Sequence, residues 1–65
     1  MKDEKANPRL LRTREAAAYL GISAWSLRNL VYGEQIPVVQ LADNAPFLFD
    51  VRDLDAFIER HKRTG

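Results

Sequence analysis

The sequence has no cysteine, a single histidine and no long apolar run. Without cysteine no disulfide can form, and one histidine is too small a donor set for a dedicated zinc site. No stretch approaches the roughly 20 apolar residues of a membrane-spanning helix, and the opening residues MKDEK lack the apolar core of a signal peptide. We therefore expect a soluble, cytoplasmic protein that binds no metal or cofactor.

Groupings typical of catalysis are also missing. His61 has no serine or cysteine at triad-like spacing, and the chain has no glycine-rich loop that could cradle a phosphate. Asp53 and Asp55 are explained by capping and solvation of a helix. We expect neither an enzymatic activity nor a small-molecule substrate.

With 65 residues the chain forms one small domain at most. Residues 1–9 are charged and end in Asn-Pro, which favours a flexible arm. We expect a single folded domain over residues 10–62 and a short tail over residues 63–65. A core this small needs good helix capping or a partner to be stable.

The net charge of +1 hides an asymmetry along the chain. Residues 1–32 hold six Lys/Arg against three acids, whereas residues 33–59 hold one Arg against six acids. The last six residues add three positive charges. An anionic partner would therefore meet the first half and the tail rather than the middle, unless these charges serve only solubility.

The segment 13–32, TREAAAYLGISAWSLRNLVY, predicts two short helices joined by a glycine turn. We expect Thr13 to cap the first helix, Gly21 to end it in a left-handed conformation and Ser23 to cap the second. Helical spacing places an apolar face inside, and it places the remaining large side chains on the opposite face. The inner face holds Leu27, Leu30 and Val31, and the outer face holds Trp25, Arg28, Asn29 and Tyr32.

The remaining segments predict a hairpin and a closing helix. Residues 36–41 are apolar and β-branched, which predicts a strand, and residues 42–46 are of types that favour a turn. Residues 47–49 predict a second short strand that pairs with the first. Phe47 and Phe49 share one face, which we expect to be the inner one, with Leu48 on the other. Asp50 then caps a helix whose apolar stripe is Val51, Leu54, Phe57 and Ile58.

This order of elements resembles the small winged helix-turn-helix proteins of the excisionase and MerR-like group. The resemblance rests on residues 11–23, on Ile36-Pro37 and on residues 53–57, DLDAF. It implies a mainly α fold with a small β-hairpin, the wing, and double-stranded DNA binding without catalysis. The second helix, Ser23–Tyr32, would enter the major groove, and the wing would lie along the neighbouring backbone.

This chain departs from that pattern in its charges. Ala24, Asn29 and Tyr32 stand where basic residues are frequent in the family. The wing turn carries one aspartate and no lysine or arginine, so phosphate would repel it. We therefore expect modest affinity from a single monomer.

The candidate DNA-binding residues divide by chemistry. Arg28 can pair with guanine, contact a phosphate or remain solvated, and Asn29 can read adenine or be an ordinary exposed residue. Arg12 and Arg14 are candidate backbone contacts, and Trp25 can meet thymine methyls, a protein partner or the rest of its own chain. The full candidate set is Arg12, Arg14, Ser23, Ala24, Trp25, Ser26, Arg28, Asn29 and Tyr32.

Two classes of function follow. The first is a sequence-specific DNA-binding accessory protein, either an excisionase-type factor or a small transcriptional regulator of a mobile element. It would associate with the nucleoid and act with a recombinase or with further copies bound cooperatively. The second is a protein-interaction module that uses Trp25, Tyr32 and Leu48. The DNA-binding head of a phage packaging protein is a further alternative.

Overall fold

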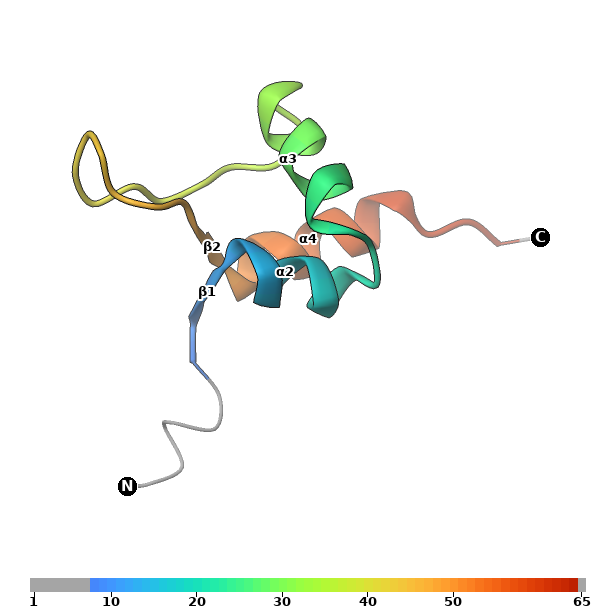
Figure 1. Ribbon diagram of the computed structural model, residues 1–65. Helices are drawn as coiled ribbons and strands as arrows, with labels where there is room; N and C mark the ends of the chain where they lie inside the picture. Colours follow the sequence, from blue (N-terminus) through green and yellow to red (C-terminus); the bar gives the residue numbers. More distant parts are fainter. Residues whose placement is uncertain (1–7, 65) are drawn as a thin grey trace.

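A computed structural model describes residues 8–64 of the chain. Three helices and two short strands follow one another along it (Figure 1). In chain order they are β1 (Leu10–Arg12), α2 (Thr13–Leu20), α3 (Ala24–Tyr32), β2 (Leu48–Asp50) and α4 (Val51–His61). This is the mainly α winged helix-turn-helix arrangement that the sequence predicts.

The corner between α2 and α3 forms as expected. Gly21 adopts φ = 75°, and the backbone amides of Gly21 and Ile22 donate to the carbonyls of Ala18 and Ala17 at 3.1 and 3.0 Å. This pair of bonds is a Schellman motif, which satisfies the last carbonyls of a helix while reversing the chain. The Ser23 hydroxyl then accepts a hydrogen bond from the Ser26 amide at 3.0 Å and caps α3.

The start of α2 differs from the prediction. Thr13 is the first helical residue, and Arg12 occupies the capping position. The cause is that β1 runs directly into the helix without an intervening residue, so its last residue becomes the cap. Glu15 compensates by accepting a hydrogen bond from the Arg12 amide at 3.1 Å.

The end of α3 carries an unusual residue. The amides of Glu34 and Gln35 donate to the carbonyls of Val31 and Leu30 at 3.0 and 2.9 Å, which is a second Schellman motif. Its left-handed position is held by Glu34, with φ = 59°, rather than by Gly33. A non-glycine residue there costs conformational energy.

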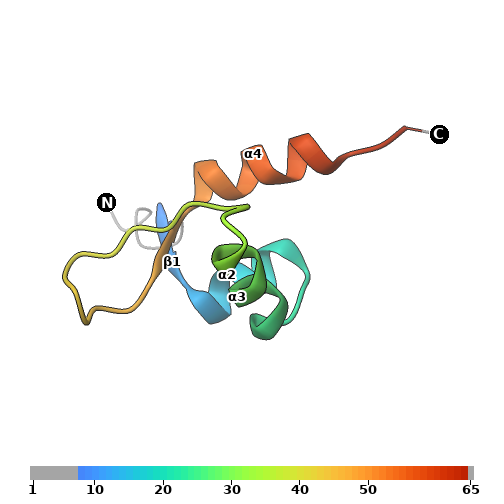
Figure 2. The same ribbon diagram turned by 90° about the horizontal axis from the view of Figure 1, so that it is seen from above.

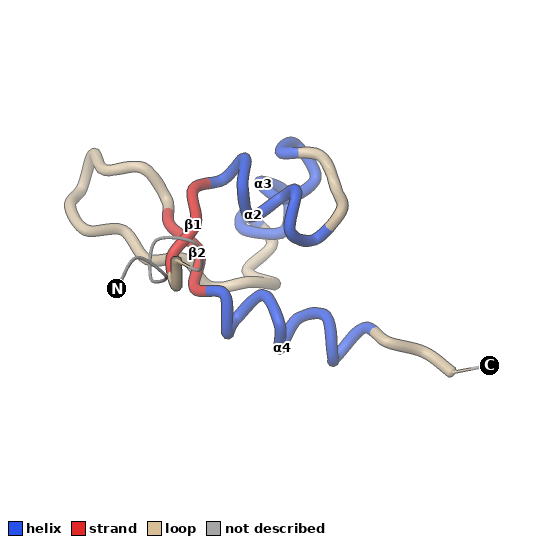
Figure 3. The backbone as a smooth tube through the Cα atoms, turned by 90° about the horizontal axis from the view of Figure 1, so that it is seen from below, coloured by secondary structure: helices blue, strands red, loops and turns tan. Residues whose placement is uncertain are grey.

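The sheet differs from the predicted hairpin in its pairing. Strands β1 and β2 lie side by side (Figure 3) and pair antiparallel, with Leu11 facing Phe49. Among the described residues, the first half of the wing contributes only one bridge, between Val39 and Leu48. Extending that bridge in register would next pair residues 37 with 50 and 41 with 46. Positions 37 and 46 are both proline, which has no amide to donate, so no strand forms over residues 36–41.

The core lies where the corner, the sheet and α4 meet. Leu27 and Leu54 are fully buried, and Phe49 is 1% exposed. Among residues 8–64 the buried residues are Ala16, Ala17, Leu27, Ile36, Phe49 and Leu54. Ala16 and Ala17 allow α3 to approach α2 closely, and Asp50 caps α4 through the Arg52 amide at 2.9 Å, as predicted. Within residues 8–64, no helix has the length and apolar character needed to cross a membrane.

Candidate nucleic-acid interface

Helix α3 stands at the edge of the molecule with its outer face free of the rest of the domain (Figure 1). Successive helical residues are about 100° apart, so burying Leu27 directs the opposite side toward solvent. Trp25 and Tyr32 are each 70% exposed, and Arg28 and Asn29 are also exposed. The four residues that the sequence assigns to an outer face are therefore together on one exposed surface, which we call the α3 outer face.

One flank of α3 turns toward the wing and the start of α2. Arg28 lines a shallow hollow of about 300 Å³ there, together with Thr13, Gln40 and Pro46. A second hollow of about 370 Å³ also contains Thr13 and Pro46, and Arg12 and Arg14 line it. Because the two hollows share these residues, the three arginines lie along one continuous surface.

The other flank of α3 turns toward the C-terminal end of α4. Ser26 and Leu30 line an apolar groove on that side, away from Arg28. The Ser23 hydroxyl is bonded to the Ser26 amide and lies 3.1 Å from the Ser26 hydroxyl. Among the predicted residues, Ser23 and Ser26 are thus used in capping, and half-buried Ala24 offers only a methyl group.

The wing (residues 38–47) is shaped by Gln40. Its side-chain amide donates to the carbonyls of Asp43 and Ala45 at 3.2 and 2.9 Å, which folds the turn back on itself. No lysine or arginine lies between Arg28 and Arg52, so the wing presents only the charge of Asp43. It borders the arginine surface without adding a positive charge to it.

Asp50 joins the start of the domain to α4. Its Oδ2 accepts hydrogen bonds from Arg9 Nη2 and Nε at 2.9 and 3.1 Å, while its Oδ1 caps α4. These hydrogen bonds, that from Arg9 first, hold the pKa of the Asp50 carboxyl below its ordinary value. Arg9, which the sequence assigns to a flexible arm over residues 1–9, is thus anchored by its side chain. Residues 1–7 of that arm lie outside the described residues.

Three residues that border the candidate interface were not evident from the sequence. Thr13, Gln40 and Pro46 border Arg28, and only their distance along the chain concealed this. Leu48, expected to face outward, is half-buried because β2 lies between β1 and Val39. Leu41 is instead the exposed apolar residue of the wing, at 75%.

These features define a class of protein. A helix-turn-helix corner, an adjoining wing and an exposed second helix beside three arginines are the architecture of a winged helix-turn-helix DNA-binding domain. Residues 10–62 match the helix-turn-helix domain family, and the chain belongs to that family. No curated protein and no solved structure matches the chain significantly.

Membership of this family implies sequence-specific DNA binding. The family consists of small DNA-binding domains of the excisionase type, which are generally not enzymes. DNA is therefore the class of partner that this domain binds.

Proposed function

We propose that this protein is a double-stranded DNA-binding accessory factor that inserts the α3 outer face into the major groove. The observation that carries the proposal is the separation of the two sides of α3. Leu27 is fully buried and fixes the helix, while Trp25 and Tyr32 remain 70% exposed on the other side. A helix held in this way can enter a groove about 12 Å wide without rearrangement of the domain.

The residues divide between positioning and reading. Arg12 and Arg14 at the start of α2 contact phosphates and set the orientation of the domain. Arg28 and Asn29 reach base edges, where a guanidinium suits guanine and an amide suits adenine. Trp25 packs on sugar or thymine methyl groups, and Tyr32 contacts the DNA at the C-terminal end of α3. Ser23 and Ala24 lie at the start of α3 and allow it to approach the DNA backbone closely, whereas Ser26 faces the groove beside α4 and is left out of the DNA contact.

The finer role is that of an excisionase-type factor or a small regulator of a mobile element. A domain of this size with a wing lacking positive charge buries little surface on DNA. Useful occupancy therefore requires a recombinase or further copies beside it. Either partner raises the local concentration enough to compensate for weak binding by one monomer.

The test uses Trp25, the only tryptophan in the chain, as a fluorescent reporter. We expect its emission to change and saturate as mixed-sequence duplex is added at low salt. Arg12 and Arg14, the two arginines assigned to phosphates, give a slope of log affinity against log salt of about −2. Fluorescence that does not respond to any duplex would contradict the proposal.

A second function is favoured by one observation. Trp25 and Tyr32, two of the residue types that dominate protein interfaces, are both largely exposed on α3. A protein-interaction module would use them on a protein surface rather than a duplex. In that case Trp25 emission would respond to a protein partner and remain unchanged with DNA.

A further inference from the structure

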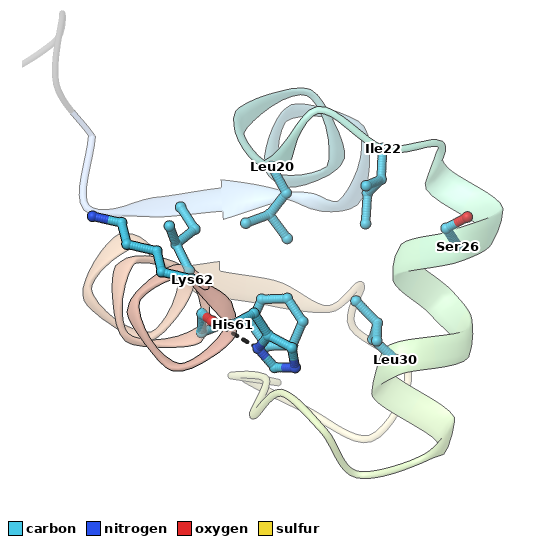
Figure 4. Close-up of a pocket in the computed structure, with 8 residues that line it drawn as sticks. Leu20, Ile22, Ser26, Leu30, His61 and Lys62 are labelled. Carbon is cyan, nitrogen blue, oxygen red and sulfur yellow. Dashed lines mark hydrogen bonds between the residues drawn. The ribbon is translucent and has the colours of Figure 1, made fainter. Parts of the chain in front are cut away.

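An open apolar groove of about 510 Å³ lies between α3 and the C-terminal half of α4 (Figure 4). Leu20, Ile22 and Leu30 point into it from the α2–α3 side in the close-up view. Phe57 and Ile58 line it from α4, with His61 and Lys62 at its end. The Phe57 carbonyl lies 2.9 Å from His61 Nδ1, which holds the imidazole beside the Phe57 ring. The groove is thus preformed and largely apolar.

The wing offers an exposed apolar side chain that an apolar groove can receive. Leu41 is 75% exposed, more than any other large apolar residue described, and Ala42 beside it is exposed as well. The Gln40 amide fixes the turn that follows through its two bonds to backbone carbonyls. Leu41 therefore projects from a constrained loop, which reduces the entropy lost when such a side chain is held in a partner.

The charges of the two surfaces are complementary. Asp43, two residues after Leu41 on the wing, is exposed, and the wing has no positive charge. Lys62 lines the end of the groove, and both Lys62 and Arg63, which follows it in the chain, are exposed. Lys62 pairs with Glu59 at 2.9 Å, but both side chains are more than 60% exposed, so this pair is readily exchanged.

The two surfaces lie at opposite ends of the molecule. In Figures 1 and 2 the wing extends to the left, and the C-terminal end of α4 extends to the right. Helix α3 lies between them, with Arg28 facing the wing side and Ser26 facing the groove side. A wing therefore cannot fill the groove of its own chain, so any wing that fills it belongs to another copy.

We propose that the groove receives the wing of a second copy of this chain, with Leu41 inserted and Asp43 against Lys62 and Arg63. The inference rests on the proposed DNA binding, because the shared duplex brings the copies together. The contact is heterologous, so it repeats in one direction and can continue along the DNA. One inserted leucine and a few charges form a small interface. The protein is therefore a monomer in free solution and associates on DNA, where the local concentration is high.

The absence of native cysteine allows a direct test by cross-linking. Leu41→Cys and Ile58→Cys proteins are mixed and treated with a short bis-maleimide. The mixture is compared without DNA, on a duplex of about one helical turn (10 base pairs) and on one of about five turns. A Leu10→Cys protein mixed with Ile58→Cys is the matched control, because Leu10 is 38% exposed on β1, outside both surfaces.

On the long duplex, we expect the yield of the cross-linked wing–groove pair to be at least several-fold higher than that of the control pair. We also expect it to be higher than the yield of the same pair on the short duplex. Equal yields for the two pairs, or equal yields with and without DNA, would overturn the proposed contact. A second variant, Leu41→Ser, which removes the apolar side chain without adding charge, should retain binding to the short duplex and lose cooperativity on the long one. Unchanged cooperativity would also overturn it. Failure of the unmodified protein to bind the short duplex would instead contradict the proposed function, and Trp25 emission reports this separately.

Discussion

At the scale of single residues, Arg28 and Arg14 test the division between reading and positioning. Arg28 belongs to the α3 outer face and borders the hollow beside the wing, whereas Arg14 lies at the start of α2. If Arg28 pairs with a base, Arg28→Ala should weaken binding to a selected duplex about tenfold or more and leave binding to random duplex less affected.

The matched substitution is Arg14→Ala, which should weaken binding to both duplexes by the same factor and reduce the salt slope by about one. The measurement is a pair of titrations on a duplex selected from a random library and on a scrambled duplex. Equal losses on both duplexes after Arg28→Ala would reassign Arg28 to the DNA backbone.

Asp50 makes the stability of the domain depend on pH. Its carboxyl has a lower pKa in the folded chain than in the unfolded chain, because Arg9 and the Arg52 amide bond the charged form. The unfolded chain therefore takes up the proton first as pH falls. The stabilisation is complete above about pH 4 and is lost as pH falls through the lowered pKa.

We therefore expect the melting temperature of Asp50→Asn to lie below that of the unmodified protein at pH 7 and to approach it near pH 3. Thermal unfolding followed by circular dichroism at both pH values measures this. Asp43→Asn, which removes an exposed carboxylate of the wing, is the control. A constant difference between Asp50→Asn and the unmodified protein across this range would contradict the role of Asp50.

At the scale of elements, we expect substitutions in the two Schellman motifs to change the free energy of unfolding in opposite directions. Gly21 holds the left-handed position after α2, and a methyl group there would meet open space, so Gly21→Ala is penalised only by the backbone conformation. Glu34 holds the equivalent position after α3 without being glycine. We expect Gly21→Ala to lower the free energy of unfolding by about 1 kcal/mol and Glu34→Gly to raise it by about 0.5–1 kcal/mol.

Denaturant unfolding at constant pH measures both changes. A stabilising Gly21→Ala or a destabilising Glu34→Gly would show that the tight turns are not the features that fix the helix ends. The comparison also bears on function, since the first motif sets the angle at which α3 leaves α2.

The helices and the sheet differ in how well the sequence predicts them. Helical spacing, the Gly21 turn and the Ser23 and Asp50 caps correctly predicted the three helices, because these signals are local. The sheet was predicted only in part. The second strand falls close to β2 and Val39 does bridge to it, but the pairing of β2 with β1 joins segments far apart in the chain, which no local signal predicts. The two prolines that limit the wing were visible, but their effect depends on a register that only the Val39–Leu48 bridge fixes.

At the scale of the whole molecule, the fold brings together what the chain separates. Arg12, Arg14 and Arg28 come from two helices and the strand before them, and they meet around Thr13 and Pro46, the latter from the wing. Helical geometry alone predicted the α3 outer face. The hollows and the groove depend on how the wing and α4 lie against the corner, which no local pattern encodes.

The central claim is that the α3 outer face is the surface that meets DNA. The most direct test is a titration of isotopically labelled protein with duplex DNA, followed by nuclear magnetic resonance. We expect the largest shifts at the amides of Trp25, Arg28, Asn29 and Tyr32 and at the Trp25 indole N–H. Shifts confined to α4 or the wing, with the α3 outer face unchanged, would contradict the claim.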